Sequence, residues 1–269
     1  MSPSLAAAAP DLPAFADLGP AQLSAVVIAA YLVVGEPFVG YVLHRRFEGR
    51  LRTDPAARRS FYRRLLVLEW GLALVALVVW AAATDVSAAQ VGLVLPQRWP
   101  GAFSWLACAA LLVLVFVSTR ALRSGALAGP PPEVLRMTRP GEARHAEPPG
   151  HATLALLPRS TSERRLFGLV GVTAGVCEEW LYRGFFLAVV GALLPGLPPA
   201  GLVLVAGMAF GLAHAYQGLS GILTTGVLGG VLAGVYLSTG SLLLPVLLHA
   251  AIDLRFLLVP SSALPAAAR

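Results

Sequence analysis

The fold is decided by residues 166–194, which read LFGLVGVTAGVCEEWLYRGFFLAVVGALL. Two adjacent carboxylates, Glu178 and Glu179, and one cation, Arg183, interrupt a run that is otherwise apolar. The run is longer than the roughly 20 residues that one bilayer crossing requires. We therefore expect either one tilted helix or two shorter helices broken near Gly184. Ionisable side chains in hydrocarbon are costly unless partners or water relieve them, so this cluster indicates a functional site.

The composition of the whole chain is typical of a membrane protein with many spans. Of its 269 residues, 57% are hydrophobic and 13% are charged, and the mean hydropathy is +0.74. A soluble domain spreads polar residues along every element to cover its surface, whereas here they gather in a few stretches between apolar runs. The sequence therefore predicts an all-α fold, a polytopic transmembrane helical bundle with seven or eight crossings.

Five parts are expected along the chain from the distribution of apolar runs and of Pro, Gly and Arg. They are an N-terminal tail at 1–20, three accessory transmembrane helices with an Arg-rich cytoplasmic loop at 21–121, a cytoplasmic Pro/Gly/Arg-rich linker at 122–165, a motif-bearing helical bundle at 166–259 and a C-terminal tail at 260–269. Proline and glycine argue against one continuous helix in the linker. A short interfacial helix at 133–138 or at 152–157 is compatible with its sequence.

Arginine supplies all 20 basic residues and gives the chain a formal charge of +6. Most of the arginines fall in two stretches between helices: Arg45, Arg46, Arg50, Arg52, Arg58, Arg59, Arg63 and Arg64, then Arg120, Arg123, Arg136, Arg139, Arg144, Arg159, Arg164 and Arg165. The positive-inside rule places both stretches in the cytoplasm, with the amino terminus outside. Anionic lipid headgroups suit such clusters, so no nucleic-acid partner is expected. The absence of lysine and the surplus of alanine favour a GC-rich bacterial source, hence the bacterial inner membrane.

Other polar and small residues of the apolar runs are expected to be structural. Glu36 and Glu69 should pair with each other or with an arginine. Cys108 and Cys177 should pack as small apolar side chains without a disulfide. Close helix packing is expected at Gly226, Gly229, Gly230 and Gly234, which include two overlapping small-xxx-small spacings.

Helical spacing assigns different roles to the two adjacent carboxylates. At about 100° per residue, Arg183 lies on nearly the same face as Glu179 and far from the face of Glu178. Arg183 should therefore neutralise Glu179. Glu178 is left free in an apolar site, and we expect it to act as a general base.

Two further motifs bring imidazoles into separate apolar runs. His249 and Asp253 are one helical turn apart, so both can face one cavity, where the carboxylate would hold the tautomer of the imidazole or donate when protonated. His214 lies one turn after Phe210, which should pack beside its ring. Two buried histidines and a spare carboxylate together favour proton transfer chemistry over purely structural roles.

In order, these residues form the patterns EExxxR, FxxxH and HxxxD. This combination resembles the CAAX protease and bacteriocin-processing family (CPBP, or Abi) of intramembrane glutamic endopeptidases, which is related to the type II CAAX prenyl endopeptidases. The resemblance covers residues 166–259. It implies that Glu178 and His214 activate the attacking water and that His249 and Asp253 stabilise the oxyanion. Glu179, Arg183 and Phe210 would support them.

One position departs from the prenyl-processing branch of that family. Asp253 stands where that branch often has asparagine, and a carboxylate would repel an oxyanion unless it were protonated or turned toward His249. The resemblance therefore implies an intramembrane endopeptidase of a membrane-associated or lipidated protein or peptide, without specifying a prenylated one. Substrate and membrane lipids are the expected partners.

Three alternatives fit the same residues. In the first, His214, His249 and Glu178 bind zinc, although the resemblance implies catalysis without a cofactor and no HExxH motif is present. In the second, the chain is a non-catalytic membrane binding factor of the bacteriocin-immunity type. In the third, the chain is a proton-coupled transporter, which is less well supported because no inverted repeat is evident.

Overall fold

The computed structural model describes residues 19–51, 53–124 and 151–264, and this part of the chain is helical and contains no strand, which confirms the all-α fold. Its α-helices are α1 (Pro20–Ala30), α2 (Glu36–Arg50), α3 (Ala57–Ala82), α4 (Ala102–Arg123), α6 (His151–Leu156), α7 (Thr161–Glu179), α8 (Leu187–Leu193), α9 (Pro199–Ala213), α10 (Gly218–Thr239) and α11 (Leu243–Leu254). Two π-helical segments, Tyr31–Gly35 and Trp180–Phe186, join α1 to α2 and α7 to α8. Short 3-10 turns cover Ala215–Gln217, Arg255–Leu258 and Ser261–Ala263.

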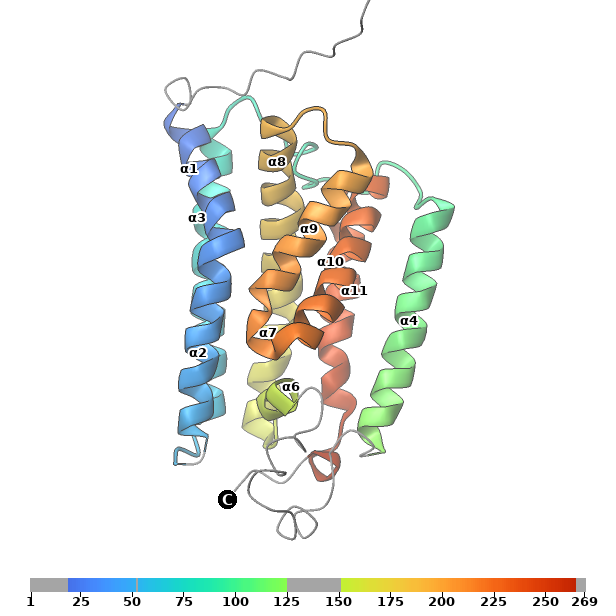
Figure 1. Ribbon diagram of the computed structural model, residues 1–269. Helices are drawn as coiled ribbons and strands as arrows, with labels where there is room; N and C mark the ends of the chain where they lie inside the picture. Colours follow the sequence, from blue (N-terminus) through green and yellow to red (C-terminus); the bar gives the residue numbers. More distant parts are fainter. Residues whose placement is uncertain (1–18, 52, 125–150, 265–269) are drawn as a thin grey trace, which may run out of the picture.

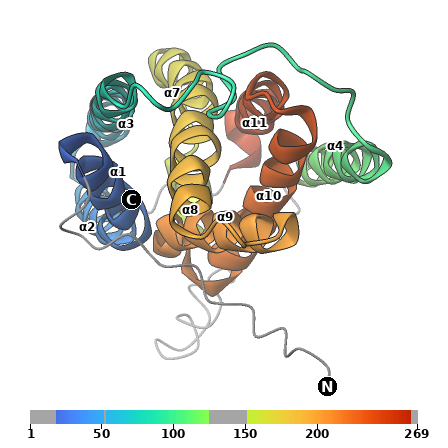
Figure 2. The same ribbon diagram turned by 90° about the horizontal axis from the view of Figure 1, so that it is seen from above.

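A central rod made of α7 and α8 organises the bundle. Helices α1, α2 and α3 lie on one side of it, and α9, α10 and α11 lie on the other (Figures 1 and 2). The most extensive contacts join α9 to α10, α11 to α7 and α3 to α7. Helix α4 lies at the outer edge beyond α10. Helices α1 and α3 on one side and α9 and α11 on the other therefore pack directly on the α7–α8 rod.

The central rod is continuous, so the predicted break near Gly184 is absent and the single-helix alternative holds. Ser160 and Glu163 form a capping box at its start, where the two side chains satisfy each other's backbone N–H groups. The helix widens to π geometry over Trp180–Phe186, and every residue of that segment is buried. Single π turns inside α-helices occur frequently at functional sites. This one begins directly after Glu179.

The described arginine-rich segments lie at one end of the bundle. The α2–α3 junction, the end of α4, α6 and the start of α7 all lie at the lower end in Figure 1. Arg58 donates to the Ala155 carbonyl at 3.0 Å, and the Tyr62 hydroxyl donates to the Leu156 carbonyl, so α3 and α6 are tied together. A common end is what the positive-inside rule requires. Helix α6 confirms the expected helix at 152–157, whereas 133–138, Arg52, Arg136, Arg139 and Arg144 lie outside the described residues.

Four helices of the described ranges are long and apolar enough to cross a bilayer, by length and composition: Pro20–Arg50, Ala57–Ala82, Ala102–Arg123 and Ala215–Thr239. Helix α9 is apolar but shorter. The predicted seven or eight crossings are thus only roughly supported. The charged residues at both ends of α7 lower its hydropathy, so composition alone does not identify it as a span.

Helices α9 and α10 touch through their backbones. A Cβ atom on Gly211 would lie 2.6 Å from the Ile222 carbonyl oxygen, and one on Gly207 would lie 2.8 Å from that of Gly226. Such distances leave no room for any side chain. The predicted close packing at Gly226 is therefore confirmed, and it holds the end of α9, which carries His214, against α10.

Replacing Gly211 by alanine should destabilise the protein. Forcing a methyl group into this contact should cost about 1–3 kcal/mol, as for other overpacked sites. Gly191→Ala is the matched control, because nothing lies within 4 Å of its added Cβ, and helix propensity alone should leave it unchanged or slightly stabilised. Thermal unfolding of both variants in detergent measures the difference. Equal unfolding temperatures would contradict the close contact.

Candidate active site

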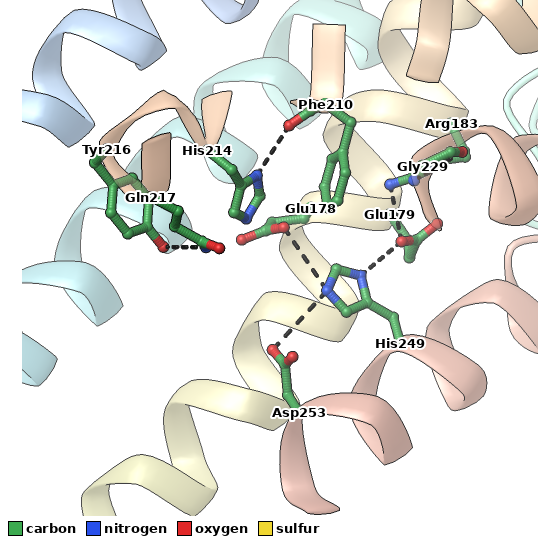
Figure 3. A network of polar contacts seen from close by, with 10 residues as sticks. All are labelled: Glu178, Glu179, Arg183, Phe210, His214, Tyr216, Gln217, Gly229, His249 and Asp253. Carbon is green, nitrogen blue, oxygen red and sulfur yellow. Dashed lines mark hydrogen bonds and ion pairs between the residues drawn. The ribbon is translucent and has the colours of Figure 1, made fainter. Parts of the chain in front are cut away.

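Close approach of α7 and α11 brings the first and third motifs together. A Cβ atom on Gly175 would lie 2.9 Å from the Cβ and 3.0 Å from the backbone nitrogen of Ala250, so only glycine allows this spacing. As a result His249, next to Ala250, reaches Glu179 although 70 residues separate them. The distance from His249 Nδ1 to Glu179 Oε1 is 2.7 Å (Figure 3).

Glu179 and Arg183 form a fully buried ion pair. Arg183 Nη1 donates to Glu179 Oε1 at 2.9 Å, and both side chains are 0% exposed. The other guanidinium nitrogen, Nη2, donates to the Gly229 carbonyl at 3.1 Å, and the guanidinium lies 4.4 Å from the centre of the Phe210 ring. The pairing predicted from helical spacing is therefore confirmed. The same contacts tie the π segment of the α7–α8 rod to α9 and α10.

His249 is held by Glu179 and not, as predicted, by Asp253. Glu179 Oε1 accepts a hydrogen bond from Arg183, so it acts as an ionised acceptor, and the proton shared with His249 belongs to Nδ1. The opposite nitrogen, Nε2, lies 3.8 Å from Glu178 Oε2 and 3.9 Å from Asp253 Oδ2. These two separations exceed a direct hydrogen bond and suit a bridging water or a reacting group.

The second imidazole, His214, is fixed by its own helix. It follows the last residue of α9, and its Nδ1 lies 2.9 Å from the Phe210 carbonyl oxygen. A carbonyl can only accept, so Nδ1 carries the proton and Nε2 is an acceptor in the neutral ring. The Phe210 ring centre lies 4.7 Å from that of His214 and 5.7 Å from that of His249. Phe210 therefore packs beside His214 as predicted, and it also contacts His249.

Exposure separates the charged residues into two layers. The side chains of Glu178 and Asp253 are 20% and 31% exposed, whereas Glu179 and Arg183 are inaccessible. Figure 3 shows the side chains of Glu178, His249 and Asp253 directed toward one region between the helices. The buried pair thus acts as a support behind two partly exposed carboxylates, Glu178 and Asp253, and the buried imidazole of His249 that lies between them. Such an arrangement can bind water and transfer protons.

Two carboxylates of the accessory helices also approach this region, which spacing within one helix could not indicate. Glu36 interacts with Tyr31 and lies within electrostatic range of Glu178 and His214. Glu69 lies within range of Glu178, and its Oε2 atom is buried without a hydrogen-bond partner. Of the two expected pairings, neither glutamate forms an ion pair with an arginine in the described ranges, whereas Glu69 lies within electrostatic range of Glu36. The accessory helices therefore add acidic groups to the site.

The two cysteines are free and buried, as expected. Among residues 19–51, 53–124 and 151–264, no three or more His, Cys, Asp or Glu side chains form a group that could hold a metal ion. His214, His249 and Glu178, the alternative zinc ligands, accordingly do not form one. Glu179 holds His249 through its Nδ1 atom, and the Phe210 carbonyl holds His214 through its Nδ1 atom.

Fold and site together define a multi-pass helical membrane protein with a partly accessible glutamate–histidine cluster. Residues 162–255 match the family described as type II CAAX prenyl endopeptidase Rce1-like, and this segment contains every residue of the three motifs. The comparisons with curated proteins and with solved structures found no match. The match of residues 162–255 to the model of this family of CAAX-type proteases confirms the resemblance read from the motifs.

Replacing Arg183 by methionine should strongly destabilise the protein, because Glu179 would remain charged in a site without solvent. Breaking a buried ion pair on one side typically costs about 3–5 kcal/mol. The double variant Glu179→Gln/Arg183→Met removes both charges and should recover part of that loss. Unfolding temperatures of the two variants in detergent measure this. A double variant less stable than Arg183→Met would contradict the pairing.

Proposed function

We propose that this protein is an intramembrane endopeptidase that hydrolyses a peptide bond of a membrane-associated or lipidated substrate with a water activated by Glu178 and His214. The observation that carries the proposal is the contrast between Glu178 and Glu179. Glu179 is buried and holds Arg183 and His249, whereas the Glu178 side chain is 20% exposed and its Oε2 atom, which has no hydrogen-bond partner among the described residues, lies 3.8 Å from His249 Nε2. A general base must be accessible, and its orienting partners must be fixed.

The reaction would begin with proton transfer from water to Glu178. His214 would accept a hydrogen bond from the same water at Nε2, the nitrogen that the Phe210 carbonyl leaves free. The hydroxide oxygen then bonds to the scissile carbonyl carbon, and the carbonyl oxygen becomes an oxyanion. When the C–N bond breaks, Glu178 returns its proton to the leaving amine. Water is thereby consumed, and one carboxylic acid and one amine are formed.

His249 would stabilise the oxyanion. Protonated at both nitrogens, it keeps its Nδ1–H bond to Glu179 and offers Nε2–H to the developing charge. Asp253 Oδ2 lies 3.9 Å from the same nitrogen, so this carboxyl group is turned toward His249.

The cellular location of the protein and its partners are part of the same proposal. The apolar helices and the family place the protein in a membrane. We propose that this is the bacterial inner membrane, that substrate and lipids are its partners, and that neither a cofactor nor nucleic acid is needed. The described arginines at one end of the bundle suit the cytoplasmic leaflet.

Glu178→Gln should abolish processing and leave the fold intact. Loss of a general base typically lowers the rate by about 10²–10⁴-fold. Asp85→Asn is the control, because Asp85 is an exposed loop carboxylate outside the site. Membrane fractions of cells that make equal amounts of each protein are compared for new peptide ends. If the protein were only a binding factor, wild type, Glu178→Gln and Asp85→Asn would give the same peptide ends. Unchanged processing in Glu178→Gln would contradict the proposal.

Metal removal should leave turnover unchanged. Purified protein is treated with a strong zinc chelator, its metal content is measured, and cleavage of a peptide identified from the membrane comparison is followed. A glutamate-activated water needs no metal, so the rates before and after treatment should agree. Loss of turnover on chelation, restored by added zinc, would favour the zinc alternative.

A further inference from the structure

A surface groove lies between α2 and α3, at the arginine-rich end of the bundle. Its volume is about 720 Å³, and Leu43 of α2 and residues on successive turns of α3 line it. The α3 residues fall into a charged group, Arg59, Arg63 and Arg64, followed by an apolar pair, Val67 and Leu68. None of these residues belongs to the Glu–His cluster, so the groove is distinct from the candidate active site.

The charged half of the groove holds cations without partners of their own. Arg63 and Arg64 form no hydrogen bond or ion pair with any described residue, and Arg59 has only a longer-range attraction to Asp54. Asp54 is already engaged, since hydrogen bonds from the Ala56 backbone and from Arg50 lower its pKa. The adjacent Arg58, which does not line the groove, has a partner, because it donates a hydrogen bond to the Ala155 carbonyl.

Three unpaired guanidinium groups within two helical turns repel one another. Like charges spaced by four residues destabilise a helix slightly, so the arrangement calls for an external anion. The planar guanidinium fork matches phosphate oxygens in pairs, and two or three such forks can surround one phosphate group. The chemistry of the charged half therefore favours a phosphate ligand.

The apolar half of the groove determines which phosphate ligand fits. One turn after Arg64, the side chains of Val67 and Leu68 are 72% and 44% exposed, and the partly buried Leu43 faces them across the groove. Exposed apolar residues continue along α3 at Leu74, Val75 and Val78. The lining of the groove thus changes from charged to apolar, as a lipid changes from headgroup to acyl chain. The positive-inside rule places the bilayer interface at this same end of the bundle.

We propose that this groove is a binding site for an anionic phospholipid, with the phosphate held by Arg59, Arg63 and Arg64 and an acyl chain along Val67 and Leu68. The proposal is independent of the proteolytic function. Since α3 packs on α7, a lipid bound here also steadies the helix that supports Glu178 and Glu179 from the accessory side.

Binding is measured on the purified full chain by native mass spectrometry, with phosphatidylglycerol and phosphatidylcholine of identical acyl chains. Wild type should retain phosphatidylglycerol preferentially. The groove variant Arg59→Gln/Arg63→Gln/Arg64→Gln should lose about a hundredfold in affinity for it, because each arginine at the surface adds about 1 kcal/mol to the attraction. Arg63→Gln alone, which preserves more of the helix charge, should lose about fivefold.

A matched control removes the same charge elsewhere on the same end. Arg46, Arg120 and Arg123 are exposed and form no ion pair within the described residues, so Arg46→Gln/Arg120→Gln/Arg123→Gln should bind like wild type. Leu68→Asp should weaken phosphatidylglycerol binding without any change in the arginines. Equal losses in the two triple variants would show diffuse charge attraction and overturn the proposal.

Two further results would also overturn it. Equal retention of phosphatidylcholine by wild type would show that the groove does not select an anionic headgroup. Displacement of phosphatidylglycerol by excess inorganic phosphate would show that the site takes a free anion and not a lipid. Retention of the lipid in excess phosphate, with loss in the groove variant, supports the assignment.

Discussion

One carboxylate, that of Glu179, connects the parts of this protein. Its Oε1 atom accepts hydrogen bonds from Arg183 at 2.9 Å and from His249 at 2.7 Å, in a region without solvent. A charge so deeply buried is tolerated only when its partners are fixed, and those partners come from the π segment that follows α7 and from α11. Arg183 extends the connection to the Gly229 carbonyl of α10 and to the Phe210 ring of α9. Four helices are thus positioned around a single ion pair.

The helix contacts around this pair are made possible by residues without side chains. Gly175 lets α11 approach α7, and Gly211 lets α9 approach α10. In a bilayer, burial of apolar surface drives helix association weakly, because lipid is as apolar as the helices, so close van der Waals contact and buried polar links matter more. Backbone proximity and the Glu179 network therefore act together. The first brings the motifs within reach, and the second sets their orientation.

Much of the site could be predicted from the sequence because its local pairs obey helical periodicity. The spacing of Glu179 and Arg183 predicted their ion pair, and the spacing of Phe210 and His214 predicted their contact. The link from His249 to Glu179 could not be found this way, since it joins residues 70 positions apart and depends on how α7 and α11 pack. Asp253, one turn from His249, was the obvious local partner, but it lies on the accessible side of the ring.

The fold, like the site, could be predicted from the sequence only where it depends on local pattern. Apolar runs predicted the helices and their order, whereas the continuity of the α7–α8 rod through a π segment depends on tertiary packing around residues that are all buried. The approach of Glu36 and Glu69 to the site likewise arises from packing of the accessory helices on the rod. Periodicity within a segment carries no information about such contacts.

The most direct test of this account is a double-mutant cycle between Glu179→Gln and His249→Gln, measured by the free energy of unfolding in detergent. If Glu179 holds His249 as described, the two substitutions should be coupled by about 0.5–3 kcal/mol, the range typical of residues in one polar network. Additive effects, with no coupling between the two positions, would contradict the claim that this carboxylate organises the site.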